Sequence, residues 1–348
     1  MAKRLKVGII GLGSISPFHI DSYKACPRAE IVAVCDKSES WLEFVKNKHG
    51  IPKAYTDYKE LLKDSEIEAV SLCLPTYMHA EGTIAALEAG KHVLCEKPMA
   101  ANARDAKKMH EAAVKSGKKL MISQNMRFDQ ITQTLHERAE SGFFGDIYFA
   151  RIAWRRPLGM MPGPEDIREN GEKINRNWFN EKDFCGGVLR DLGSHLIDLT
   201  MFITGFPKLA SADARAYRKF FPEEYKAGNF ICDSEDMATA HIKFENGLTV
   251  QLEVSFGSFI EEQIILTEIY GTKGGAARRG GSLKFFAQDG AGNGITEHLT
   301  RFKAAHKGPQ ARFVDCVLDD TEVPVPSEQG VKVIEILDAI YASAGKIL

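Results

Sequence analysis

The sequence predicts an α/β chain of two domains, a doubly wound parallel sheet followed by an open, mainly antiparallel sheet. Three observations support this fold class. An apolar strand near the N-terminus runs directly into a glycine-rich turn, and short apolar strands then alternate with helices as far as residue 124. Beyond that point hairpin-like strands follow one another, so we expect domains at 1–124 and 125–348.

The composition is that of an ordinary globular protein. With 348 residues, 44% of them hydrophobic and 26% charged, the chain can bury two cores. A net charge of −2 gives no electrostatic reason to expect nucleic acid or a membrane surface as a partner, and no apolar run is long enough to span a bilayer. Seven cysteines without a C-x-x-C pair indicate reduced thiols in the cytoplasm.

The glycine-rich turn fits a dinucleotide-binding fingerprint. Residues 5–10 form a predicted buried strand, and the pattern G-x-G-x-x-G/A follows with Gly11, Gly13 and, in the third position, Ser16. Gly11 permits the tight turn, and Gly13 lets backbone N–H groups approach a pyrophosphate at a helix N-terminus. A glycine pattern alone is weak evidence, because any tight strand-to-helix turn needs glycine.

An acidic residue strengthens the interpretation. The predicted strand 31–35 ends at Asp36, about 20 residues beyond the glycines, where a carboxylate would bind the adenosine ribose hydroxyls. Asp36 would repel a ribose phosphate and favours NAD, whereas Lys37 beside it could admit NADP. The alternative is that Asp36 is only a cap or turn residue.

Strand and helix alternation continues along the first domain. We expect helices near 38–49, 57–63, 79–89 and 102–116, and strands at 53–55, 69–74, 92–95 and 119–123. In such sheets ligands bind outside the carboxyl ends of the strands. The segments 75–79 and 96–98 follow two of these strand ends, on the rim of the sheet that carries the glycine turn.

Lys97 is the chemically notable residue of that rim. It lies between Glu96 and Pro98 and should point to where a nicotinamide would bind, an environment that favours its neutral amine. A neutral lysine could take the proton of a substrate hydroxyl as hydride leaves the carbon. The alternative is a solvated surface lysine paired with Glu96.

A second constellation lies in an apolar helix predicted from residue 185 onward. Asp191, His195 and Asp198 fall at i, i+4 and i+7, on one line along one face. Three interpretations remain open: a buried Asp–His pair satisfied by backbone, groups that bind a polyhydroxylated substrate, or metal ligands. The metal interpretation has the least support, since nothing nearby adds a clear third ligand, and no metal is expected.

The second half predicts a sheet with few helices to cover it. Predicted strands lie at 146–155, 209–218, 235–245, 248–257, 263–271 and 282–287, and predicted helices at 129–141, 309–319 and 328–345. An open sheet with an uncovered apolar face suggests a homodimer or homotetramer assembled through that sheet. The alternative is that helices of the same chain suffice.

The segment 156–184 is long, rich in Pro, Gly and Arg, and without a predicted element. It contains Arg168, Arg176, Trp178 and Phe179. Loops of this length are usually functional, so it could recognise a sugar or act as an arm on a neighbouring subunit.

These motifs together resemble the Gfo/Idh/MocA family, named for glucose–fructose oxidoreductase, inositol dehydrogenase and a rhizopine-catabolism protein. The matching residues are Gly11-x-Gly13-x-x-Ser16 with His19, Asp36, Pro75-Thr-x-x-His79, Glu96-Lys97-Pro98 and Gly186-Gly187-x-x-x-Asp191-x-Gly193-x-His195-x-x-Asp198. The resemblance covers nearly the whole chain. It implies that Lys97 is the catalytic lysine, that Asp191 and His195 bind substrate and relay a proton, and that Gly11, Gly13 and Asp36 contact NAD. Ser16 is the one departure from the pattern.

The predicted site has three groups of residues. Catalytic roles are expected for Lys97, Asp191 and His195. Cofactor contacts are expected from Gly11, Gly13, Ser14, Ile15, Asp36, Lys37, Pro75, Thr76, His79, Glu96, Lys97 and Asn125. Substrate contacts are expected from Lys97, Arg127, Trp154, Arg156, Trp178, Asp191 and His195.

The predicted function is an NAD(P)-dependent dehydrogenase or reductase acting on a hydroxyl-bearing carbon of a cyclitol, sugar or sugar derivative, with Lys97 as general acid/base. One alternative is glycoside cleavage by transient oxidation. The other is a cofactor-binding sensor without turnover, which need not keep Lys97, Asp191 and His195 together and for which the chain shows no DNA-binding module.

Overall fold

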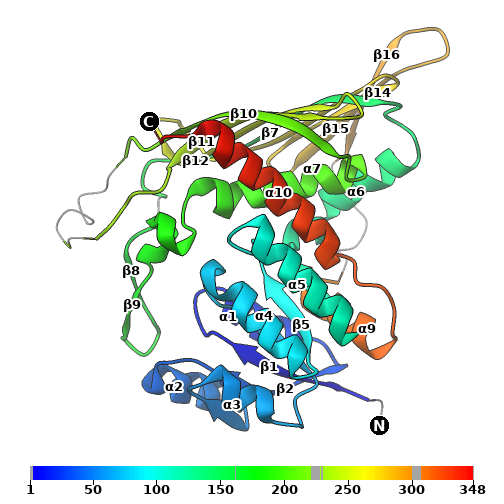
Figure 1. The fold of residues 1–348 in the computed structure, drawn as a ribbon. Helices are drawn as coiled ribbons and strands as arrows, with labels where there is room; N and C mark the ends of the chain where they lie inside the picture. Colours follow the sequence, from blue (N-terminus) through cyan, green and yellow to red (C-terminus); the bar gives the residue numbers. More distant parts are fainter. Residues whose placement is uncertain (1–2, 161, 221–227, 229, 300–306, 348) are drawn as a thin grey trace. The chain divides into compact units, whose positions relative to one another are not determined.

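The computed structural model describes residues 3–160, 162–220, 228, 230–299 and 307–347 (Figure 1). The chain forms two compact units. The first unit comprises 1–125, 165–175 and 307–334, and the second comprises 126–164, 176–306 and 335–348. Among the described residues, no helix is both long enough and apolar enough to cross a membrane.

A six-stranded parallel sheet forms the centre of the first unit, in the order β3-β2-β1-β4-β5-β6. This is the order of a doubly wound dinucleotide-binding fold and confirms the predicted fold class. The strands are β1 (Leu5–Ile10), β2 (Ala29–Cys35), β3 (Lys53–Tyr55), β4 (Ala69–Leu72), β5 (His92–Glu96) and β6 (Leu120–Ser123). The central strands are buried on both faces, which is why they are runs of Val, Ile and Leu rather than alternating patterns.

Five α-helices connect these strands, and α4 and α5 pack side by side (Figure 1). They are α1 (Ser16–Lys24), α2 (Glu39–His49), α3 (Tyr58–Lys63), α4 (His79–Glu88) and α5 (Ala103–Ser116), with the short helix η1 (Thr76–Met78) before α4. Local chemistry sets their ends: the Ser38 hydroxyl caps α2 and the Asn102 side chain caps α5, while Gly50 and Gly117 end the same two helices in the left-handed conformation.

Two later segments complete the first unit. The hairpin of β8 (Glu165–Ile167) and β9 (Lys173–Asn175) contacts α2, and α9 (Pro309–Leu318) leads into the first turns of α10 (Ser327–Ala344). Arg28 pairs with Asp315 at 2.7 Å, and the Ile122 N–H donates to the Val325 carbonyl. The first unit therefore also includes α9 and the start of α10, from the C-terminal part of the sequence.

The second unit is built on an eight-stranded sheet in the order β10-β11-β12-β7-β13-β14-β15-β16. All its pairs are antiparallel except β7 with β12, which confirms the prediction of a mainly antiparallel sheet. The strands are β7 (Ile147–Pro157), β10 (Leu209–Tyr217), β11 (Met237–Phe244), β12 (Thr249–Ser258), β13 (Ile264–Gly271), β14 (Gly274–Arg279), β15 (Ser282–Gln288) and β16 (Gly294–Leu299).

The sequence did not predict β14 and β16. β14 is built of glycine, alanine and arginine, and β16 is almost wholly exposed, so neither carries the alternation that marks a half-buried strand.

Helices α6 (Gln130–Glu140) and α7 (Ser194–Thr204) pack together, and α7 packs on β7 (Figure 1). The described part of the unit also contains the end of α10 and the short helices η2 (Asn125–Phe128), η3 (Asn177–Asn180), η4 (Lys182–Phe184) and η5 (Leu189–Gly193).

Candidate active site

The glycine turn of the first unit has the shape of a pyrophosphate cradle. Gly11 has φ +88°, and a Cβ built there would lie 2.5 Å from the Cys73 carbonyl oxygen, so only glycine fits. A Cβ at Gly13 would meet no atom within 4 Å, which leaves open space beside the backbone. The Ser16 hydroxyl donates to the Gly13 carbonyl at 2.8 Å, so serine in the third position ties the turn together. Ser14 is exposed and Ile15 is half-buried at the start of α1, as a phosphate-binding turn requires.

Asp36 follows β2, as the fingerprint predicts. Its carboxylate accepts the Leu12 N–H at 2.9 Å and the Ser38 N–H at 3.0 Å, which ties the glycine turn to the start of α2. The cap of α2 is Ser38 rather than Asp36. Lys37 beside it is exposed. The residues present therefore fit the adenosine end of a nicotinamide dinucleotide: a cradle of N–H groups with a carboxylate at its far side.

Two histidines fasten the backbone around Lys97. On one side, Glu96 accepts from His19 Nε2 at 2.8 Å and from the Lys97 N–H at 3.2 Å. On the other side, His79 Nδ1 lies 2.8 Å from the Pro98 carbonyl oxygen and its Nε2 lies 2.8 Å from that of Leu74. Burial lowers the pKa of His79 despite these bonds; the neutral ring donates to one carbonyl at a time.

The pair of His19 and Glu96 is a buried ion pair. Burial opposes both charges, yet the neighbouring Cys73 and Glu96 raise the pKa of His19 to about 10, and His19 lowers the pKa of Glu96 to about 2. Ser71 completes the network, since its hydroxyl lies 2.9 Å from His19 Nδ1 and 3.0 Å from Tyr23. Both ring nitrogens of a charged His19 thus have partners. Glu96 and His79, predicted as cofactor contacts, are buried and engage protein groups.

In the second unit, a turn of π-helix replaces the regular helix expected around Asp191. Residues 189–193 form η5, and α7 continues from Ser194. A π turn holds more residues than an α turn, so the strict i, i+4, i+7 line does not apply, and such turns are frequent at functional sites. Gly187 precedes it with φ +113° and lies against the buried carboxylate of Glu235.

The buried carboxylate of Glu235 accepts a hydrogen bond from this π turn. Its Oε1 accepts the Leu189 N–H at 3.0 Å and the Tyr341 hydroxyl at 2.7 Å, and burial raises the pKa of this carboxyl despite those bonds. Arg190 stacks on the Tyr341 ring at 4.4 Å. These residues could not be predicted from the sequence, because Glu235 and Tyr341 are 106 positions apart and neither belongs to a motif.

Four predicted substrate residues come together beside the π turn. The Trp154 and His195 rings lie 5.9 Å apart, and the Arg156 guanidinium lies 5.4 Å from the Trp154 ring. Burial lowers the pKa of Arg156 and the charge of nearby Asp191 opposes that shift. Trp154 Nε1 and Arg156 Nε are buried N–H groups without a hydrogen-bond partner among the described residues. An aromatic face with donors, an imidazole and a carboxylate is suited to a polyhydroxylated molecule.

Asp198 is separate from that cluster. Its carboxylate binds the Arg127 guanidinium at 2.7 and 2.5 Å, both side chains are 2% exposed, and the guanidinium lies 5.1 Å from the rings of Phe202 and Phe206. Asp198, which the sequence places on one line with Asp191 and His195, thus pairs with an arginine 71 positions away in the sequence. We accordingly treat Arg127, predicted as a substrate residue, as half of a structural ion pair.

The other predicted positions are dispersed. Pro75 and Thr76 follow β4 on the rim of the parallel sheet, and Asn125 is exposed after β6. Trp178 stacks on Phe179 with ring centroids 3.9 Å apart. Within the described part of the chain, no group of three His, Cys, Asp or Glu side chains is arranged to hold a metal ion.

Comparison with known families matches both units. Residues 5–124 match the oxidoreductase family with an NAD-binding Rossmann fold, and residues 132–277 match the GFO/IDH/MocA C-terminal domain. The chain belongs to the Gfo/Idh/MocA oxidoreductase family. It is an NAD(P)-dependent oxidoreductase with an NAD-binding Rossmann domain. The predicted cofactor class is thereby confirmed.

Curated relatives carry dehydrogenase names. D-glucoside 3-dehydrogenase of Escherichia coli is 30% identical over 98% of this chain and 95% of its own length. Myo-inositol 2-dehydrogenase of Thermotoga maritima is 30% identical over 78% of this chain and 74% of its own length. Among solved structures, levoglucosan dehydrogenase in complex with NADH has a TM-score of 0.85 at 22% identity, covering 98% of this chain and 97% of the other, which supports the fold.

The buried pair predicts a pH-dependent stability. Folding raises the pKa of His19 from 6.5 to about 10, so the contribution of His19 to the free energy of unfolding is complete below pH 6.5 and is lost as the pH rises to 10. Folding lowers the pKa of Glu96 from 4.5 to about 2, so the contribution of Glu96 to the free energy of unfolding is lost as the pH falls below 4.5. Urea unfolding at pH 5.5, 7.5 and 9.5 should show His19→Gln destabilised by about 3 kcal/mol at pH 5.5 and progressively less above it. An equal difference at all three pH values would contradict the ion pair.

The Arg127–Asp198 pair predicts a different signature. Asp198→Ala leaves a buried guanidinium without its carboxylate and should cost about 3–5 kcal/mol of unfolding free energy, whereas the double variant Arg127→Met/Asp198→Leu should recover most of it. The double variant should also retain the KM of the native protein for its substrate. A KM raised tenfold or more in a stably folded double variant would return Arg127 to the substrate site.

Proposed function

We propose that this protein oxidises a secondary hydroxyl group on the ring of a sugar, glycoside or cyclitol, reversibly and with NAD(H). The observation that carries the proposal is the restraint on the backbone around Lys97: buried His19, through Glu96, holds the Lys97 N–H, and buried His79 bonds to the carbonyl of the next residue, Pro98. A solvated surface lysine would not need a backbone that is restrained in this way. The glycine cradle and Asp36 beside it fit the dinucleotide.

The reaction requires removal of one proton and one hydride from the carbinol. The bound nicotinamide ring supplies the hydride acceptor. Lys97, as a neutral amine, takes the hydroxyl proton during oxidation and returns it from the ammonium form during reduction. Its restrained backbone limits the positions its amine can reach, which lowers the cost of orienting it in the transition state.

Asp191 and His195 act on the substrate from the second unit. The carboxylate of Asp191 accepts a hydrogen bond from a neighbouring hydroxyl, and His195 orients the reacting hydroxyl or relays its proton. Arg156 and Trp154 supply N–H donors that no described residue uses, and the Trp154 face suits the C–H groups of a sugar ring. Polyols present this mixture of hydroxyls and C–H groups.

The names of the relatives support the substrate class. A glucoside, an inositol and levoglucosan are named for proteins that match along most of this chain. These compounds share rings that carry secondary hydroxyls. All seven cysteines are free and buried, which supports the expectation that the enzyme works in the reducing cytoplasm.

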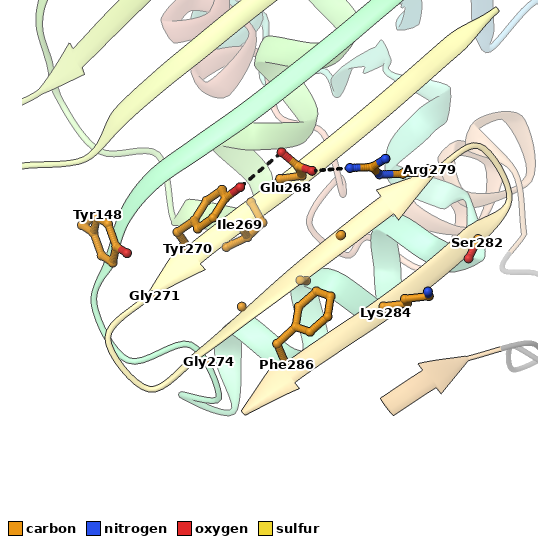
Figure 2. A pocket seen from close by; sticks show the side chains of 13 residues that line it. Tyr148, Glu268, Ile269, Tyr270, Gly271, Gly274, Arg279, Ser282, Lys284 and Phe286 are labelled. Atoms are coloured by element: carbon orange, nitrogen blue, oxygen red, sulfur yellow. Dashed lines mark hydrogen bonds and ion pairs between the residues drawn. The ribbon is translucent and has the colours of Figure 1, made fainter. Parts of the chain in front are cut away.

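The exposed face of the second sheet supports a homo-oligomer. A hollow of about 640 Å³ opens there between β13, β14 and β15, beside the exposed rings of Tyr148, Tyr270 and Phe286 (Figure 2). Glu268 accepts from Tyr270 and pairs with Arg279 at 3.1 Å, so polar groups are partnered within the face (Figure 2). We infer that a second copy of the chain covers this surface.

The proposed reaction predicts a selective loss in Lys97→Met. Reduction of NAD and NADP should be followed with a panel of inositols, aldopyranoses, glycosides and anhydrosugars. One stereochemical series should be oxidised, and Lys97→Met should lose about 10²–10⁴-fold in kcat with NADH affinity retained, because a general base is removed. Lys63→Met, at an exposed ion pair on α3, is the matched control and should keep full activity.

Unchanged turnover in Lys97→Met would remove Lys97 from the mechanism. Cleavage of a glycoside without net NADH formation would instead indicate transient oxidation, and NADH binding without turnover on any compound would favour a sensor.

The sheet face predicts the effect of one charge on assembly. Tyr270→Glu should reduce the mass measured by sedimentation equilibrium at micromolar concentration from that of a dimer or tetramer towards a monomer, because a carboxylate would be buried against a second copy. Val114→Glu, at an exposed position of α5, is the control. A monomeric native protein would contradict the proposed assembly.

A further inference from the structure

The tip of the β8–β9 hairpin is attached to the turn that follows β2 (Figure 1). Glu172 Oε2 accepts from the hydroxyls of Ser38 at 2.7 Å and Ser40 at 2.8 Å, and these bonds lower the pKa of the Glu172 carboxyl. Lys48 of α2 donates to Glu169 at 2.7 Å. The hairpin thus lies on the same turn that presents the ribose-binding carboxylate.

Arg168 is the hairpin residue that reaches that carboxylate. Its side chain is 11% exposed, its Nη1 lies 3.1 Å from Glu172 Oε1, and its Nη2 lies 3.5 Å from Asp36 Oδ2. The guanidinium lies 5.0 Å from the ring of Trp41, whose Nε1 donates to the Leu12 carbonyl at 2.8 Å. Arg168 is therefore held between an aromatic ring and two carboxylates, beside the glycine turn.

The contact between Arg168 and Asp36 is long for a charge-assisted hydrogen bond. A charge-assisted N–H···O bond is about 2.7–2.9 Å long, so 3.5 Å places the guanidinium beside Asp36 without a tight bond. Arg168 Nε is also buried without a partner among the described residues. A ribose bound at Asp36 would therefore lie beside the Arg168 guanidinium.

The positive charge of Arg168 beside Asp36 changes the balance between NAD and NADP binding. A lone carboxylate at the end of β2 excludes the 2′-phosphate of NADP by repulsion. Here the positive charge of Arg168 offsets Asp36, and exposed Lys37 adds a second cation next to it in the sequence. Arginine suits phosphate because its planar fork donates two parallel hydrogen bonds.

We propose that Arg168 is a specificity-determining residue for the cofactor, whose guanidinium offsets Asp36 and donates to a 2′-phosphate, so that the site binds NADP(H) as well as NAD(H). The hairpin thereby completes the adenosine-ribose pocket from a segment 132 residues further along the chain than Asp36. The inference rests on the nicotinamide cofactor of the proposed function and does not depend on the sugar.

Direct titration of the protein with NADH and NADPH, followed by cofactor fluorescence, tests the proposal without any turnover. The native protein should bind NADPH with a Kd within about 20-fold of that for NADH. Arg168→Met should raise the Kd for NADPH about tenfold or more and that for NADH less than about threefold, because only the phosphate loses a charge partner. Arg168→Lys should restore part of the NADPH affinity that Arg168→Met loses, because lysine keeps the positive charge but not the planar fork.

Lys48→Met is the matched control, since it removes a hairpin contact without altering the charge beside Asp36. Equal changes of both Kd values in Arg168→Met, or no change in either, would show that Arg168 only holds the hairpin and would overturn the proposal. So would a native protein that binds NADH but not NADPH. Failure of the sugar panel with these affinities intact would count against the proposed function alone.

Discussion

The buried ion pair of His19 and Glu96 is the interaction on which the reactive part of the first unit depends. Two opposite charges inside the parallel sheet are costly to bury, and they persist because Ser71 and the Lys97 peptide satisfy their remaining hydrogen-bonding groups. The ion pair joins the end of β5, which directly precedes Lys97, to α1, the helix that begins at the glycine turn. The glycine turn and the backbone of Lys97 are thus linked to each other within the first unit.

The second unit uses a similar arrangement with different residues. A buried carboxylate, Glu235, holds the N–H of Leu189 and the hydroxyl of Tyr341, and so fixes the π turn from which Asp191 projects. Gly187 is required there because its backbone has φ +113° and any side chain would meet that carboxylate. In both units a buried carboxylate accepts a backbone N–H at or near a residue of the proposed mechanism, Lys97 in the first unit and Asp191 in the second.

Much of the fold could be predicted from the sequence because it follows local rules. Gly11, Gly13 and Asp36 are read at fixed spacing, and apolar runs separated by helices specify a parallel sheet. The prediction failed where structure depends on distant partners: Arg127 with Asp198, Glu235 with Tyr341, and α9 with the first unit. The π turn was missed because helical periodicity assumes a constant number of residues per turn, and the contacts of Arg168 were missed because a loop has no periodicity at all.

In the proposed reaction, hydride passes between a ring carbon of a polyol and the nicotinamide. The most direct test is to supply a substrate from the active stereochemical series with deuterium on the reacting carbon and to analyse the reduced cofactor by mass spectrometry and NMR. We expect one deuterium at C4 of the nicotinamide and a ketone at the corresponding carbon of the product. A reduced cofactor without deuterium, formed together with oxidised product, would contradict it.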